Sequence, residues 1–143
     1  MNTTSHTVFQ KEFRLRFRDA DPAGILFFGH IFSLAHDAFE DFIQAAGFTW
    51  DEWFRTDKYM VPIRHAESNY LKPFLPGQIY TVRASVAKIS QSSFQMRYAF
   101  QQNQNAHAEV LMVHTFLDQK SKVKIPVPEL VRQRLGVYLE SIP

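Results

Sequence analysis

The longest helical pattern in the chain begins at Gly29 and ends at Gly47. Apolar residues recur there at spacings of three and four, and acidic and polar residues occupy most of the opposite face. The apolar positions are Ile31, Leu34, Ala35, Ala38, Phe39, Phe42, Ile43 and Ala46. Gly47 stands where a glycine commonly ends a helix. The width of the apolar stripe predicts a helix that is largely wrapped by other structure.

A strand is predicted before this helix and a short helix after it. Phe13, Leu15 and Phe17 alternate with three arginines, and a period of two is typical of a strand with one buried face. Thr49 and Glu52 form a capping-box pattern, which predicts the start of a second, short helix.

From residue 61 onward the period of two returns and predicts four or so strands. The strand candidates are residues 61–71, 80–86, 94–100 and 109–118. Their connections are short, which makes neighbouring strands antiparallel. Pro128 then begins a predicted C-terminal helix, which we assign to the segment 128–143.

These elements predict one α+β domain that spans residues 1–143, with residues 1–7 as a loose tail. One long helix cannot cover both faces of a five-stranded sheet. We therefore expect a strongly curved antiparallel sheet wrapped around the long helix. The free edge of that sheet and its remaining apolar surface are expected to close by dimerisation.

Composition removes several classes of function. The chain has no cysteine, which excludes disulfide scaffolds, cysteine-based metal sites and thiol nucleophiles. The net charge of +2 is too small to indicate nucleic acid or an anionic membrane as a partner. The sequence contains no readable signal peptide and no apolar run long enough to span a membrane, so the cytoplasm is the expected compartment.

The candidate chemistry lies in the turn just before the long helix. Asp21 sits there between Asp19 and Gly24, close to the unpaired N–H groups that a helix start provides. Such N–H groups polarise a carbonyl oxygen, and a carboxylate beside them attacks the carbonyl or activates a water. This pair suits the hydrolysis of a thioester. The alternative is that Asp21 only caps its own turn, and Asp19 competes with it for either role.

The segment from Phe17 to Phe28 resembles the signature of the 4-hydroxybenzoyl-CoA thioesterase-like hotdog family. The resemblance implies the hotdog fold, a homodimer that pairs into a tetramer, and hydrolysis of acyl-CoA without a metal or other cofactor. It also implies that Asp21 is the catalytic carboxylate, acting as nucleophile or as base. The backbone N–H of Phe28 matches the group that polarises the thioester carbonyl.

Two further stretches point to one branch of that family. Residues 36–40 and 61–66 are similar to segments of the hydrolases that act on 1,4-dihydroxy-2-naphthoyl-CoA in phylloquinone biosynthesis. This similarity implies an aromatic acyl-CoA substrate. The alternatives are 4-hydroxybenzoyl-CoA, a short or medium aliphatic acyl-CoA, and a non-catalytic module that binds acyl-CoA or an acyl carrier.

Two residues are predicted to contact the acyl group. His65 shares a strand face with Glu67, and two such groups are too few for a metal site. We expect His65 either to join a polar network or to face the acyl pocket. Phe94 begins an aromatic stripe that continues through Met96, Tyr98 and Phe100. The stripe predicts core packing first, and part of it is expected to line a pocket for a flat ring.

Overall fold

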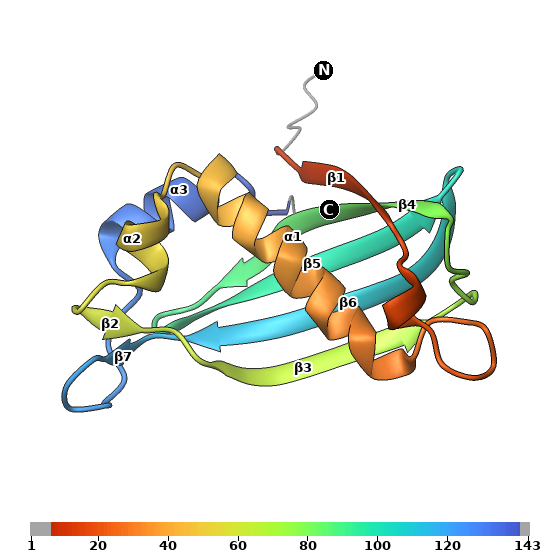
Figure 1. Cartoon of the computed structure of the whole chain (residues 1–143). Coiled ribbons are helices and arrows are strands. Elements are labelled where there is room, and N and C mark those ends of the chain that lie inside the picture. The colour runs from red at the N-terminus through yellow and green to blue at the C-terminus, as the bar shows by residue number, and fades with distance from the viewer. Residues whose placement is uncertain (1–6, 141–143) are drawn as a thin grey trace, which may run out of the picture.

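The protein is a five-stranded antiparallel sheet with one long helix across a face (Figure 1). The computed structural model describes residues 7–140. The strands are β1 (Phe9–Arg14), β2 (Tyr59–Met60), β3 (Ile63–Tyr70), β4 (Ile79–Ile89), β5 (Ser93–Gln102), β6 (Asn105–Thr115) and β7 (Leu117–Asp118). The helices are α1 (Ile31–Ala45), α2 (Trp50–Phe54) and α3 (Glu129–Gly136). The sheet order is β1-β4-β5-β6-β3, and β2 pairs separately with β7.

Helix α1 is the predicted central helix, and its caps follow the sequence signals. The face toward the sheet is buried, and it consists of Ile31, Ala35, Ala38, Phe39, Phe42 and Ile43. At the C-terminus Gly47 has a φ of +105°. The N–H of Gly47 donates to Gln44 O at 3.0 Å and that of Phe48 to Ile43 O at 3.2 Å. A glycine-ended helix of this kind satisfies its last carbonyls.

The aromatic stripe of β5 forms the centre of the core. Phe94, Met96, Tyr98 and Phe100 are all fully buried beneath α1, so core packing is confirmed for the whole stripe. The capping box at Thr49 is confirmed as well. Its side chain accepts a hydrogen bond from the N–H of Glu52 at 3.1 Å, and α2 follows directly.

The predicted first strand is wrong beyond Arg14. Leu15 still donates its N–H to Gln78 O, but the chain then turns into a short 3-10 helix, and Phe17 is 90% exposed. The carboxylate of Asp19 causes this change by accepting the N–H of Arg16 at 3.0 Å. A hydrogen bond from a local side chain therefore replaces the strand hydrogen bonds that the alternation of apolar residues and arginines predicted.

The predicted C-terminal helix is shorter than the segment 128–143. It ends at Gly136, and the chain then runs beside β4, where Val86 donates to Tyr138 O and accepts from the N–H of Glu140. Pairing between β1 and β4 ends at Ala84, so this edge of β4 is open to the C-terminal segment. Residues 141–143 of the prediction, and residues 1–6 of the predicted tail, lie outside the described residues.

The two edge strands of the sheet differ in their cover. Strand β1 alternates half-buried and exposed residues, because its inner face packs against the core. Strand β3 has seven exposed residues and one half-buried residue, so neither of its faces is covered within one chain. No helix among residues 7–140 has the length and apolar character needed to cross a membrane.

Candidate active site

The loop before α1 is closed by a ladder of backbone hydrogen bonds. Phe27 donates its N–H to Asp19 O at 2.8 Å, and the N–H of Asp21 donates to Ile25 O at 3.0 Å. Gly24 closes the tip by donating to Asp21 O at 2.9 Å, with a φ of +82° that favours glycine. These bonds fix the backbone of Asp21 relative to the start of α1.

The carboxylate of Asp21 performs the turn-capping role and keeps one oxygen free. Its Oδ1 accepts the N–H of Ala23 at 2.8 Å, as expected for an aspartate that caps its own turn. Its Oδ2 has no hydrogen-bond or ion-pair partner among the described residues. Since a carboxylate has two oxygens, capping the turn leaves Oδ2 available for chemistry.

The N–H of Phe28 is free at the start of the helical segment. The neighbouring N–H groups of Leu26, Phe27 and His30 donate to backbone oxygens, whereas that of Phe28 has no acceptor within the described part of the chain. The carbonyl of Phe28 accepts a hydrogen bond from the hydroxyl of Tyr70 on β3. The loop is thereby tied to the end of β3, next to the unpaired N–H of Phe28.

Asp19 has a structural role in this loop. Its side chain is buried, and Oδ2 accepts the N–H of Arg16, while Oδ1 lies 3.9 Å from Nδ1 of His30. Both oxygens of Asp19 thus face groups of its own loop and of the helix start. Asp21 is the carboxylate of this loop that has an oxygen to spare.

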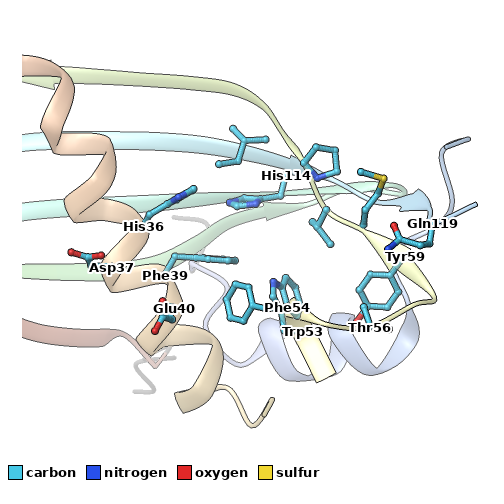
Figure 2. A pocket seen from close by; sticks show the side chains of 14 residues that line it. His36, Asp37, Phe39, Glu40, Trp53, Phe54, Thr56, Tyr59, His114 and Gln119 are labelled. Carbon is cyan, nitrogen blue, oxygen red and sulfur yellow. The ribbon is translucent and has the colours of Figure 1, made fainter. Parts of the chain in front are cut away.

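An aromatic cavity of about 500 Å³ lies at the opposite end of β3, between α1, α2 and β2 (Figure 2). Five rings line it: Phe39, Trp53, Phe54, Tyr59 and His114. Met60, Val61, Pro62 and Ile63 complete the apolar part, and the polar lining residues are His36, Asp37, Glu40, Thr56 and Gln119. A cavity of this size and lining suits a flat apolar group with a few polar contacts.

His114 is the buried polar group of this wall. It is 3% exposed, and burial lowers its pKa to about 3. The nearby His36 lowers this pKa further, whereas a hydrogen bond to the Val61 backbone opposes the shift. His114 is therefore neutral near pH 7. The sequence patterns assigned it no role, although a lone histidine directly after the apolar run from Val110 to Val113 was a usable signal.

The two residues predicted to contact the acyl group lie outside the cavity lining. His65 is exposed on β3, with its Nε2 2.8 Å from Oε1 of Glu67. Phe94 is fully buried and stacks against His114 with ring centroids 4.7 Å apart. Phe94 therefore supports the cavity wall from behind. The structure does not bring Asp21 or Phe28 to the cavity of their own chain, since neither lines it.

Within residues 7–140, no group of three or more histidine, aspartate or glutamate side chains is arranged to hold a metal ion.

Comparison with known proteins places the chain in a family. The model of the thioesterase-like superfamily matches residues 15–135. The chain belongs to the thioesterase-like superfamily. The family resemblance carried by the Asp21 segment is thus confirmed.

Two relatives within this superfamily match almost end to end. The 1,4-dihydroxy-2-naphthoyl-CoA hydrolase of Prochlorococcus marinus strain MIT 9515 is 30% identical over 134 residues, which cover 90% of this chain and 88% of that protein. The hydrolase of the same name from Microcystis aeruginosa strain NIES-843 is 27% identical over 124 residues, covering 87% and 89%.

The solved structure of a 1,4-dihydroxy-2-naphthoyl-CoA thioesterase from Synechocystis superposes with a TM-score of 0.83. The match covers 91% of this chain and 96% of that one at 19% identity. It shows a shared fold, and the predicted hotdog architecture is confirmed.

Proposed function

We propose that this thioesterase-like protein hydrolyses an aromatic acyl-CoA, with 1,4-dihydroxy-2-naphthoyl-CoA as the substrate and 1,4-dihydroxy-2-naphthoate and CoA as the products. The observation that carries the proposal is the aromatic cavity, which is of the size and lining that a bicyclic acyl ring requires. The two naphthoyl-CoA hydrolases that match most of this chain support the same substrate.

The cavity and the loop of Asp21 are too far apart to meet in one chain. Ile63, at the start of β3, lines the cavity, whereas Tyr70, at its end, contacts the Phe28 loop. At the usual rise per residue, β3 separates these two ends by about 24 Å. A complete site therefore needs a second copy of the chain.

A homodimer through β3 resolves this separation. A two-fold axis beside an edge strand pairs it antiparallel with its copy, so the start of one β3 lies next to the end of the other. The uncovered faces and free edge of β3 support this arrangement. In such a dimer the cavity of one protomer faces the partner subunit's Asp21 and Phe28. The further pairing of two dimers into a tetramer remains part of the proposal.

The chemistry follows from these two groups. The free N–H of Phe28 donates to the thioester carbonyl oxygen and stabilises the negative charge that develops there. Asp21 either takes a proton from a water, whose hydroxide adds to the carbonyl carbon, or adds directly and forms an anhydride that water opens. In both routes the C–S bond breaks, its electron pair goes to sulfur, and CoA leaves as a thiolate that then takes up a proton.

A panel of CoA esters tests the function. We expect free thiol, followed with a thiol-reactive dye, to appear fastest from 1,4-dihydroxy-2-naphthoyl-CoA, more slowly from 4-hydroxybenzoyl-CoA, and slowest from butyryl-CoA and octanoyl-CoA. Faster release from the aliphatic esters would refute the aromatic substrate. Binding of the esters without any thiol release would indicate a non-catalytic acyl-CoA module.

A further inference from the structure

The ring of His114 is held rigidly inside the aromatic wall. It stacks on Phe39 and on Phe94, with centroids 4.7 Å away in both cases and interplanar angles of 16° and 2°. Because the two phenyl rings fix the plane of the imidazole, its nitrogens can form hydrogen bonds only along the ring edge. Figure 2 shows His114 from the sheet and His36 from α1 pointing toward one another beside the cavity.

One nitrogen of this buried ring lacks a partner. The Val61 carbonyl accepts a hydrogen bond from the ring, whereas Nε2 is buried and has no partner among residues 7–140. Since the imidazole is neutral and one N–H is used on Val61, the remaining nitrogen carries a lone pair and acts as an acceptor. Buried polar atoms in proteins nearly always have a partner. An acceptor left without one in a cavity wall indicates that the bound ligand supplies the donor.

Most of the wall beside His114 is apolar, as at Phe39, Trp53 and Ile63. His36, which points toward His114 from α1, is the polar lining residue next to it. The ligand that fits is a flat ring carrying a hydroxyl, because the ring stacks and the O–H donates.

We propose that His114 is a specificity-determining residue whose imidazole accepts a hydrogen bond from a hydroxyl group on the aromatic ring of the acyl substrate. The inference rests on the proposed thioesterase function and names the substituent that the cavity recognises. An aryl ester without the hydroxyl leaves the imidazole unpaired and loses about tenfold or more in kcat/KM.

Two variants test this with matched esters. We expect His114→Phe, which keeps the stacking but removes the acceptor, to lower kcat/KM for 1,4-dihydroxy-2-naphthoyl-CoA at least tenfold more than it lowers kcat/KM for 2-naphthoyl-CoA. His114→Gln, which retains a hydrogen-bonding group, is expected to recover part of the loss. Comparing each ester between wild type and variant cancels the effect of the hydroxyls on thioester reactivity.

His107 supplies the matched control. It is a second buried histidine on β6, with its Nδ1 3.1 Å from Pro73 O, and it does not line the cavity. We expect His107→Phe to keep the wild-type ratio between the two esters. Equal ratios in wild type and in His114→Phe would overturn the role of His114 and leave the thioesterase function standing. Failure of wild type to cleave any aryl ester would instead overturn the function itself.

A binding measurement covers the case in which His114→Phe does not fold. Calorimetry on the wild-type protein is expected to give a Kd for 1,4-dihydroxy-2-naphthoate at least tenfold below that for 2-naphthoate. Equal affinities would overturn the proposal without the use of any variant.

Discussion

The two ends of β3 carry opposite kinds of site. At the cavity end, near Ile63, rings from α1, α2 and β6 form a cavity that is complete within one chain. At the loop end, near Tyr70, the candidate reactive groups lie on an exposed surface, with Phe28 65% exposed and one oxygen of Asp21 unpaired. The cavity end is a continuation of the core, and the loop end is a short closed turn. In the proposed site, recognition of the acyl group is therefore coupled to the packing of the fold, whereas reactivity depends on a few groups outside it.

This difference has an energetic consequence. A side chain such as His114 contacts several buried neighbours, so we expect its replacement to affect stability and specificity together. Asp21 contacts little beyond its own turn, so we expect its replacement to lower activity and to leave stability nearly unchanged.

The largest effect is expected at the loop end. Asp21→Asn keeps a side-chain oxygen to cap the turn but removes the carboxylate, so kcat should fall about 10²- to 10⁴-fold with an unchanged Tm. Thiol release and thermal unfolding measure the two quantities. Asp57→Asn, at an exposed aspartate far along the chain, should change neither. Comparable turnover in Asp21→Asn at matched stability would remove Asp21 from the mechanism.

Mixing two inactive variants should restore activity if the two ends meet across a dimer. Asp21→Asn lacks the carboxylate, and Thr56→Trp fills the cavity. Random pairing at equal concentrations makes half of the dimers mixed. Each mixed dimer has one intact site, in which the open cavity of one protomer faces the unchanged aspartate of the other. About one quarter of wild-type activity should therefore return. Sedimentation should show at least a dimer at micromolar concentration. No recovery after subunit exchange, or a stable monomer, would contradict the shared site.

The burial of His114 at the cavity end should make the stability of the protein depend on pH. The pKa of His114 is about 3 in the folded chain and near its ordinary value of 6.5 in the unfolded chain, so the unfolded state binds more protons between these pH values. This contribution to stability is fully present above pH 6.5 and is lost as the pH falls toward 3. At pH 5 it amounts to a loss of about 2 kcal/mol relative to pH 8.

Denaturant unfolding of wild type and His114→Gln at pH 8 and pH 5 measures that loss. The variant has no imidazole at this position, so its stability should fall by about 2 kcal/mol less than that of wild type over the same interval. Parallel losses in the two proteins would show that His114 is accessible to protons in the folded state, contrary to its burial.

The smallest effect concerns the tie between β3 and the loop. Tyr70→Phe removes the hydroxyl that donates to the Phe28 carbonyl, and because a hydrogen bond at this exposed position contributes about 0.5–1.5 kcal/mol, kcat/KM should fall about two- to tenfold. Tyr138→Phe is the control, since its hydroxyl donates to the Ala45 carbonyl at the other end of α1. Equal effects in the two variants would mean that the Tyr70 contact does not orient the reactive loop.

Several elements followed from the sequence because their causes are local. The apolar stripe of α1, the glycine that ends it and the capping box before α2 all act within a few residues. The failure at Phe17 has a local cause too. The alternation continues there, but the carboxylate of Asp19 offers the backbone a turn that competes with the strand. Periodicity alone does not predict whether the strand or the turn forms.

By itself, the sequence determined the element order, the antiparallel sheet and the loop that holds Asp21, since these depend on periodicity, turns and caps between near neighbours. Only the tertiary structure decided that His114 is buried, that Phe94 lies behind the cavity wall and that β3 is uncovered. Burial depends on which distant side chains meet: His114 owes its environment to Phe39, Val61 and Phe94, which come from three other parts of the chain.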